Sequence, residues 1–406
     1  MENILSRKQT SLMILLLSMV YFVSYLTRLD YAAVLLEIVR SEGVSKELAS
    51  LALTGSAVTY GFGQLISGYL GDKIKPYYLI AFGLFCAGVT NILIPLHPSA
   101  EYMTAVWCVN GFSQSMLWPP MIKIMAVTFD SDTYNRACLK VSWGSSLATV
   151  FVYLFAPVMI YMASWRSVFY VCAVLGITMG VIWIVAMKKF SNATSSSRST
   201  SVPEAPRQKF TAGIILILAL SMFSIVLHGA LRDGVTNWMP TYISETFKLG
   251  SEISILTGVA LPLFSILCFQ IASTVSRKWI KNEFTAAAVF FASGFIGAAV
   301  LALTGGNNVF VSVFMAALIT GAMHGVNFMF IGLLPRSFGK FSKLSFVTGL
   351  LNSSTYIGSA ISTYGIAVLS THFGWGAITW LWTFLALVPT IICVIVAKPW
   401  NKIKNL

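Results

Sequence analysis

Long apolar runs separated by short polar loops are the dominant pattern along the chain. A helix needs roughly 20 apolar residues to cross the hydrocarbon core of a bilayer. Segments of that length fall near residues 11–39, 48–70, 77–97, 103–129, 137–161 and 165–187, and again near 211–244, 251–275, 284–304, 308–334, 344–370 and 374–397. The pattern therefore predicts an all-α membrane protein with twelve transmembrane helices.

A polar stretch in the middle of the chain divides these segments into two groups of six. Residues 188–209 contain the run SSSRSTS and two prolines, a composition that cannot bury a core. We therefore expect a flexible cytoplasmic linker there, between one six-helix bundle over residues 1–187 and a second over residues 210–406. A shift of 204 positions places Arg28 on Arg232 and Lys73 on Arg277, so the two bundles are expected to be pseudo-symmetric repeats.

Composition excludes a soluble globular protein. The chain is 57% hydrophobic and only 10% charged, whereas soluble domains carry about 25% charged residues. The formal net charge of +13 does not indicate a nucleic-acid partner, because the basic residues are spread over short loops that are cytoplasmic if both termini are inside. We expect a multi-pass protein of the plasma (inner) membrane with cytoplasmic termini, in contact with the lipid bilayer.

The sequence offers no pattern for a metal, a cofactor or an enzyme active site. The six cysteines are scattered without a CxxC pair or metal-ligand spacing, and no span contains HExxH, a Cys–His pair or a carboxylate dyad. We therefore expect no metal, no cofactor and no enzymatic activity.

Two arginines inside spans, Arg28 and Arg232, are the most informative residues. A charge near the bilayer centre costs roughly 2.5–3.5 kcal/mol on insertion scales, so such residues normally face a bundle interior. They could be neutralised by Asp30 and Asp233, but two residues along a helix correspond to about 200°, which places Asp30 off the Arg28 face. The matching repeat positions favour an anion-binding site between the halves.

Polar and aromatic residues accompany both arginines at helical spacing. Tyr21 and Tyr25 precede the first arginine by seven and three residues, Tyr60 and Gln64 are four apart in the second span, and His228 precedes the second arginine by four. Guanidinium groups form bidentate, charge-assisted bonds with phosphate and carboxylate. The pattern therefore favours a small phosphate or carboxylate as ligand.

Other polar residues in spans are more ambiguous. Asn110, Gln114 and Trp118 form a stripe that ends at two prolines, which kink a helix. Lys123 lies nearly opposite Gln114 on an ideal helix and can snorkel to the interface, so it is left outside the site. His324 is a candidate cavity residue.

Asp30 and Asp233 are candidates either for structural pairing or for proton coupling, and the sequence alone leaves both roles open.

The second span ends in Gly68-Tyr-Leu-Gly-Asp72-Lys73. Small residues allow close helix approach, and Asp72 with Lys73 can latch the cytoplasmic ends of neighbouring helices. We therefore assign Asp72 and Lys73 to gating rather than to substrate contact.

The last motif resembles the loop signature of the major facilitator superfamily, which implies the major facilitator fold. Four stretches, YLTRLDYAAVL, TYGFGQLISGYLGDK, NGFSQSMLWPP and LRDGVTNWMPTY, also resemble the organophosphate:phosphate antiporter family, which carries glycerol-3-phosphate and hexose phosphates. This resemblance implies that Arg28 and Arg232 clasp the substrate phosphate. It further implies that the cavity is lined by tyrosines, namely Tyr21, Tyr25, Tyr60 and Tyr356.

The chain also departs from that family. Glycerol-phosphate members carry a lysine where this chain has Gln64, a histidine where it has Leu147, and a tyrosine where it has His324. These changes leave open which substrate is carried, and whether inorganic phosphate or protons are the coupled solute.

The sequence thus predicts a secondary active transporter of a small anion, an organophosphate by preference, that works as a monomer by alternating access. One alternative is a proton-coupled symporter of a carboxylate or sugar acid. A second, from another class, is a membrane sensor that binds the same ligand without transporting it.

Overall fold

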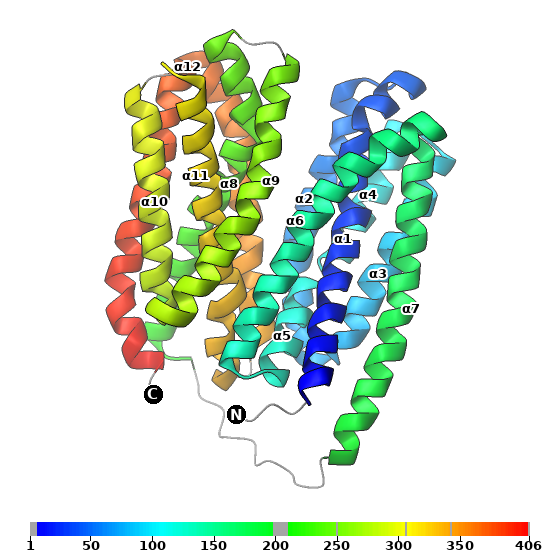
Figure 1. The fold of residues 1–406 in the computed structure, drawn as a ribbon, viewed down its shortest axis with the longest axis vertical. Helices are drawn as coiled ribbons and strands as arrows, with labels where there is room; N and C mark the ends of the chain where they lie inside the picture. Colours follow the sequence, from blue (N-terminus) through cyan, green and yellow to red (C-terminus); the bar gives the residue numbers. More distant parts are fainter. Residues whose placement is uncertain (1–5, 198–209, 249–250, 305–306, 342, 405–406) are drawn as a thin grey trace. The chain divides into compact units, whose positions relative to one another are not determined.

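The computed structural model describes residues 6–197, 210–248, 251–304, 307–341 and 343–404. These residues form helices joined by short connections (Figure 1). In chain order the helices are α1 (Arg7–Glu42), α2 (Lys46–Lys73), α3 (Pro76–Leu93), η1 (Ile94–Leu96), α4 (Ala100–Gln114), α5 (Trp118–Thr128), α6 (Ser131–Met162), α7 (Trp165–Ser197), α8 (Ala212–Phe247), α9 (Ser251–Thr274), η2 (Val275–Trp279), α10 (Glu283–Thr304), α11 (Val309–Asn327), η3 (Phe328–Leu333), η4 (Leu334–Phe341) and α12 (Leu344–Lys404).

The helices follow the twelve expected segments. Among the described residues, eight helices are individually long and apolar enough to cross a membrane. The other expected spans correspond to α2, to α4 and α5 together, to α9, and to the first part of α12. α12 contains two spans because Gly374, with φ 71°, interrupts it in the left-handed region that glycine tolerates.

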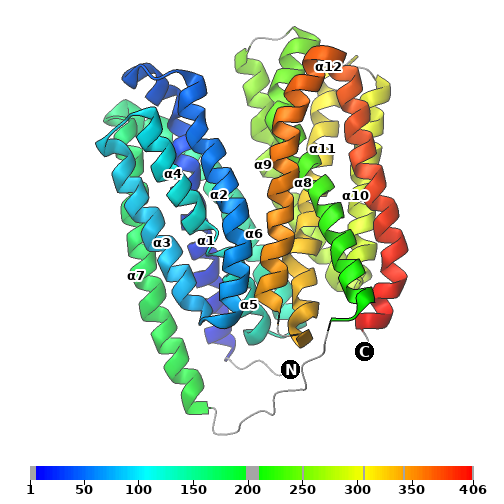
Figure 2. The same cartoon turned by 180° about the vertical axis from the view of Figure 1, so that it is seen from behind.

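The chain divides into two compact units. Unit 1 comprises Met1–Gln208 and Phe338–Ser353, and unit 2 comprises Lys209–Ser337 and Ser354–Leu406. In unit 1, α1 packs against α6 and α7, α2 packs against α4, and α3 packs against α7 (Figures 1 and 2). In unit 2, α11 packs against α8, α9 and α10. The start of α12 therefore groups with the helices of the first half.

The expected linker begins inside a helix. α7 continues to Ser197, past residue 188 where the polar composition begins. The rest of the stretch, residues 198–209, lies outside the described residues.

The helix ends show why these segments start and stop where they do. Side-chain oxygens of Ser6, Asp130 and Thr211 accept backbone N–H groups in the first turns of α1, α6 and α8, which satisfies donors that have no partner within the helix. α1 ends at Gly43 with φ 66°, and α8 ends at Lys248 with φ 58°. Both ends thus use the left-handed conformation that commonly terminates helices.

The two halves repeat in structure as well as in sequence. α1 and α8 each contain 36 residues. In unit 1 the Trp165 indole donates to Glu42 at 3.2 Å, and in unit 2 the Trp375 indole donates to Glu245 at 2.7 Å. A tryptophan indole, Trp165 in unit 1 and Trp375 in unit 2, therefore binds a glutamate at the end of the first helix in each half.

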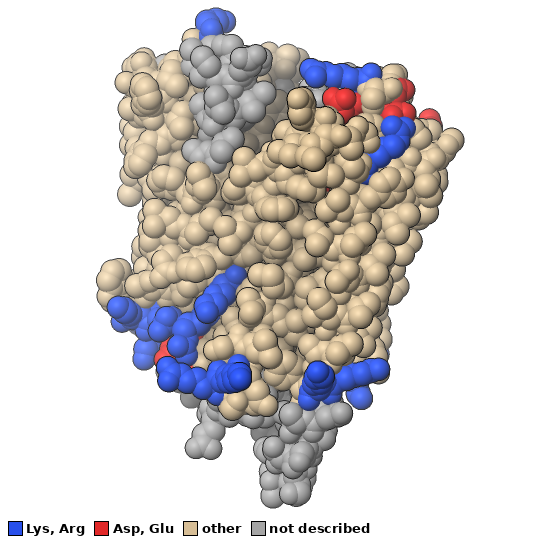
Figure 3. Space-filling model, turned by 45° about the vertical axis from the view of Figure 1, so that its right-hand side comes forward, with Lys and Arg blue, Asp and Glu red and all other residues tan. Residues whose placement is uncertain are grey.

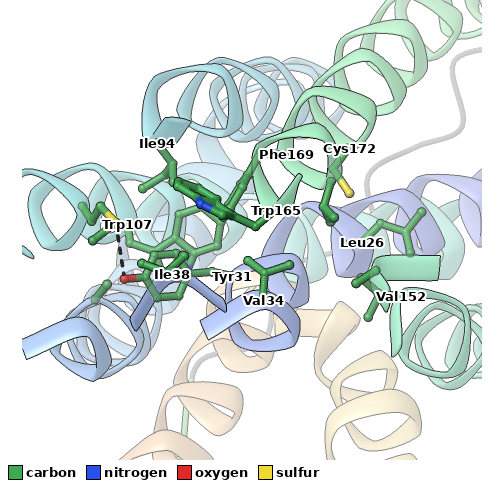
Figure 4. Close-up of a cluster of buried hydrophobic side chains, with 14 of the residues drawn as sticks. Leu26, Tyr31, Val34, Ile38, Ile94, Trp107, Val152, Trp165, Phe169 and Cys172 are labelled. Carbon is green, nitrogen blue, oxygen red and sulfur yellow. Dashed lines mark hydrogen bonds between the residues drawn. The ribbon is translucent and has the colours of Figure 1, made fainter. Parts of the chain in front are cut away.

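Aromatic packing fills the interior of unit 1 beside Trp165 (Figure 4). The rings of Tyr31 and Trp107 lie 5.2 Å apart, and Phe169 packs edge-on against Trp107 and Trp165. The Tyr31 hydroxyl donates to the Ala49 carbonyl at 2.9 Å, so its polar atom is satisfied within the cluster. This packing holds α1, α2, α4 and α7 together.

The surface agrees with a lipid environment. On the face shown in Figure 3, uncharged residues cover a broad band, and the visible lysines and arginines lie towards the helix ends. Large apolar side chains such as Leu154, Phe310 and Ile395 are more than half exposed. Because the hydrocarbon core replaces water around such a band, this exposure carries no penalty there.

The tandem prolines break the fourth span, as the sequence indicated. α4 ends at Gln114, and α5 begins at Trp118 with Pro119 and Pro120 in its first turn. Proline is tolerated there because first-turn N–H groups lack helical partners. The intervening residues close tighter turns, including a bond from Leu117 N to the Gln114 carbonyl at 3.3 Å.

Candidate functional site

In unit 1, Arg28 lies among tyrosine rings from two helices. Its Cζ atom lies 4.2 Å from the ring centroid of Tyr25 on α1 and 4.9 Å from that of Tyr60 on α2. Aromatic faces attract guanidinium groups, by about 2 kcal/mol or more when water is excluded. A half-buried arginine is thus held in place by rings rather than by the neighbouring aspartate.

Tyr21 extends this group along α1 towards α5. Its hydroxyl donates to the Tyr25 hydroxyl at 3.4 Å, and its ring lies 5.0 Å from that of Trp118. Tyr21, Tyr25 and Arg28 share one face of α1, as their spacing predicted. The structure therefore brings together Tyr21, Tyr25, Arg28 and Tyr60, with Trp118 as an additional neighbour.

Gln64 follows Tyr60 by one turn on α2. Its side chain is buried, and its amide nitrogen donates to the Ser115 carbonyl at 3.3 Å, at the break between α4 and α5. Its role in substrate binding remains a prediction.

The polar stripe on α4 fastens α4 to α1. The Gln114 amide donates to the Ser24 carbonyl at 3.0 Å and to the Thr27 hydroxyl at 2.8 Å, and the Asn110 amide donates to the Thr27 carbonyl at 3.1 Å. Both side chains are buried. These bonds fix the helix that carries Arg28 without exposing a ligand group.

Asp30 points away from Arg28. It is fully buried, and one carboxylate oxygen accepts the Tyr31 backbone N–H at 2.8 Å. The Cys172 thiol also lies against this carboxylate, and Asp30 takes part in none of the ion pairs found among the described residues.

In unit 2, Arg232 is paired with the next residue. Its Nε and Nη2 groups donate to the two carboxylate oxygens of Asp233 at 2.6 Å and 3.0 Å. The two side chains are 16% and 20% exposed, so the pair is largely shielded from solvent. The arginines of the two halves therefore differ, since one lies over aromatic rings and the other holds a carboxylate.

Two histidines lie near the Arg232–Asp233 pair, and both are bonded to backbone. His228 Nε2 lies 2.9 Å from the Met323 carbonyl, and His324 Nδ1 lies 2.8 Å from the Thr320 carbonyl. Because a carbonyl can only accept, each of these nitrogens carries a hydrogen. His324 also packs edge-on against Phe269, while Tyr356 is half-buried on α12.

At the end of α2, Asp72 caps the start of α12. Its carboxylate oxygens accept the backbone N–H groups of Ser345 at 3.1 Å and Phe346 at 2.9 Å. A carboxylate at a helix N-terminus satisfies unpaired donors and complements the helix dipole. Gly68 permits this approach, because a Cβ atom there would lie 3.2 Å from the Gly349 Cα atom.

Lys123, rather than Lys73, is the cation beside Asp72. Lys123 Nζ lies 3.5 Å from Asp72 and donates to the Gly71 carbonyl at 2.7 Å, whereas exposed Lys73 bonds to the Tyr69 hydroxyl. From the sequence, Lys123 is expected to snorkel to the interface, outside the substrate site, and it is not among the predicted gating residues. Restarting the helical phase at Trp118 could have added Lys123 to the gating residues.

Comparison with known proteins gives the chain a family context. The model of the Major Facilitator Superfamily matches residues 15–342. The "Glycerol-3-phosphate transporter" of Bacillus subtilis is 25% identical over 94% of this chain and 90% of its own length, and the "Probable hexose phosphate transport protein" of Chlamydia trachomatis is 23% identical over 94% and 89%. The "Membrane sensor protein UhpC" of Escherichia coli is 22% identical over 61% and 59%.

Solved structures show the same fold. The human organic anion transporter MFSD10 (TETRAN) matches with a TM-score of 0.72 over 96% of this chain and all of its own, at 13% identity. The expected all-α major facilitator fold is thereby confirmed.

Proposed function

Because the chain belongs to the Major Facilitator Superfamily and is a multi-pass membrane transporter, we propose that it carries a small organophosphate by secondary active transport. In this proposal Arg28 and Arg232 both bind the anion, and alternating access moves it across the membrane. The protein works as a monomer in the plasma membrane, and inorganic phosphate or protons are the coupled solute.

The observation that carries this proposal is the arrangement around Arg28. Rings of Tyr25 and Tyr60 lie against its planar guanidinium, and a stacked guanidinium directs its N–H bonds outward in its own plane. That geometry suits bidentate contact with phosphate oxygens. Tyr21 adds a hydroxyl on the same helical face. The names of the two nearly full-length relatives support the same substrate class.

A sensor function is the second candidate, favoured by the partial match to a membrane sensor protein. Separate measurements of ligand binding and of ligand uptake distinguish a transporter from a sensor. Purified protein is screened by thermal shift against glycerol-3-phosphate, glucose-6-phosphate, a sugar acid and a dicarboxylate, and the ligands found are then tested for uptake into proteoliposomes. Binding of a phosphate ester with uptake supports the proposal, binding without uptake supports a sensor, and binding of sugar acids alone supports the carboxylate alternative.

The same vesicles identify the coupled solute. Gln64 and Leu147 stand where a lysine and a histidine are expected, and Leu147 is an exposed apolar side chain. We therefore load vesicles with inorganic phosphate in one arm and impose only a pH gradient in the other. Counterflow driven by phosphate and insensitive to pH would make the transporter a phosphate exchanger.

Topology gives the first prediction. With cytoplasmic termini, the exposed residue Lys75 lies on the inner side and the exposed residue Glu101 on the outer side of unit 1. In intact cells, a membrane-impermeant thiol reagent should label Glu101→Cys and leave Lys75→Cys unlabelled until the cells are opened. The reverse pattern would place the termini outside.

Asp72 gives the second prediction. Asp72→Asn removes the charge that caps α12, and a charged hydrogen bond contributes roughly 1.5–3 kcal/mol. The equilibrium between transporter conformations should therefore shift by about tenfold or more, and uptake should slow. Affinity measured in one cross-linked conformation should stay nearly constant.

The matched control is Asp132→Asn, which removes an exposed carboxylate from the first turn of α6. It should transport normally. A large loss of affinity in the cross-linked Asp72→Asn protein would instead assign Asp72 to the substrate site.

A further inference from the structure

Asp233 accepts hydrogen bonds from the same guanidinium N–H groups of Arg232 that would bind an anionic substrate. Its two oxygens take one Nε–H and one Nη2–H bond at 2.6 Å and 3.0 Å. This two-point, planar contact is the same arrangement that guanidinium makes with phosphate or a ligand carboxylate. In unit 2 the anion position on Arg232 is thus already filled by a side chain of the protein.

We propose that Asp233 is an internal competitor of the substrate at Arg232, so that anion binding displaces the Asp233 carboxylate and is accompanied by its protonation. The inference rests on the proposed anion site and adds its coupling. One proton from water joins the carboxylate when the anion binds, and the same proton leaves when the anion departs.

Protonation follows from the surroundings of Asp233. Its side chain is only 20% exposed, and a carboxylate that loses its cation in such a place is costly. Of the described groups that act on it, Arg232 and His228 lie on α8, His324 on α11, and Ser359 on α12 supplies a hydroxyl. No described charged side chain of α9 acts on it.

The nearby histidines supply no charged partner as long as each ring carries only one hydrogen. His228 and His324 each use a ring nitrogen on a backbone carbonyl. With both histidines neutral, Arg232 is the one cation among the described groups that act on Asp233, and uptake of a proton removes the charge of the displaced carboxylate.

Asp30 in unit 1 does not compete for its arginine as Asp233 does in unit 2. It lies two residues after Arg28, whereas Asp233 directly follows Arg232. Asp30 is fully buried and accepts the Tyr31 N–H instead of pairing with an arginine. An anion at Arg28 does not have to displace Asp30. The competition, and with it the linked proton, is therefore assigned to unit 2.

The first test compares affinities for glycerol-3-phosphate and inorganic phosphate. When Asp233 holds Arg232, only the fraction of molecules with a free Arg232 can bind the anion. The measured affinity is the intrinsic affinity multiplied by that fraction. At about pH 8, Asp233→Asn should bind at least about tenfold more tightly than the unmodified protein. This ratio should shrink on acidification, because the unmodified protein takes up a proton when the anion binds and a lower pH favours that uptake. The ionisation of the ligand is common to all variants and cancels in the ratio.

The control is Glu245→Gln, which removes a carboxylate near the far end of the same helix, where it accepts the Trp375 indole N–H. It should keep the affinity and pH dependence of the unmodified protein. Equal or weaker binding by folded Asp233→Asn, or a ratio that does not change with pH, would overturn the proposal. If Asp233→Asn does not fold, Asp233→Ser is measured in the same way.

A second readout needs no substrate. An arginine-selective dicarbonyl, phenylglyoxal, should modify Arg232 severalfold faster in Asp233→Asn than in the unmodified protein, as counted by peptide mass spectrometry. Unchanged modification contradicts the competition. Faster modification with no anion binding by any variant would retain the competition and reject the proposed transport substrate, so the two failures are distinguishable.

Discussion

Loss of either arginine is expected to weaken phosphate-ester binding by about tenfold to a hundredfold or more, and lysine at either position is expected not to restore it fully. Each charge-assisted contact contributes roughly 1.5–3 kcal/mol, and 1.4 kcal/mol corresponds to a factor of ten. Lysine keeps the charge but loses the planar fork. Arg28→Lys also loses the stacking on Tyr25 and Tyr60. Affinity is measured by calorimetry on purified protein, together with folded yield.

The matched control is Arg166→Lys, an arginine that pairs with Glu42 at 2.8 Å near the end of α1. It should bind the ligand normally. If the arginines were only structural, Arg28→Lys and Arg232→Lys would lower folded yield instead of affinity, and neutralising Asp233 would restore the Arg232 variant. Well-folded variants with undiminished affinity for every anion would refute the arginine site.

The helices could be predicted because lipid imposes a simple rule on the sequence. Each span must be long, apolar and internally hydrogen-bonded, so the twelve segments are visible in the apolar pattern. The pieces within spans were harder to foresee. The proline pair indicated a break, but only the structure shows α4 ending at Gln114 and α5 beginning at Trp118.

The candidate site was predictable where one helix supplies it. Tyr21, Tyr25 and Arg28 lie seven and three residues apart, and that spacing placed them on one face. Tyr60 comes from α2, and its ring contact with Arg28 depends on how α1 and α2 pack. No spacing rule within one helix can give that contact.

Arg232 and Asp233 show where helical spacing fails to predict a contact within one helix. The sequence offered Asp233 as a carboxylate that could neutralise Arg232, but adjacent residues point about 100° apart on a helix, so helical spacing alone did not indicate a two-point contact. Long, flexible side chains can bend towards each other across that angle, and the bidentate bond formed. For Lys123, the break before Trp118 resets the helical phase, so its projection on an ideal helix gave no indication of the contact with Asp72.

The other large expected effect is a loss of stability when a glycine is replaced where α8 and α12 cross. A Cβ atom on Gly358 would overlap the Val226 carbonyl and lie 2.8 Å from the Ala230 nitrogen, and one on Gly229 would lie 3.0 Å from the Thr355 Cα atom. These neighbours are backbone atoms, which cannot move aside as side chains do. The two glycines therefore set how closely the Arg232 helix approaches α12.

We expect Gly358→Ala to destabilise unit 2 by at least about 1–3 kcal/mol, the usual cost of overpacking a filled interior. Gly376→Ala, in the second span of α12, is the control, because a Cβ atom there meets nothing within 4 Å. Alanine in an open helical position gains roughly 0.5–1 kcal/mol over glycine, so the control should melt at the same or a higher temperature. Thermal unfolding in detergent, followed by tryptophan fluorescence, compares the two. Equal melting temperatures for both variants would mean that α8 and α12 do not approach this closely in the membrane protein.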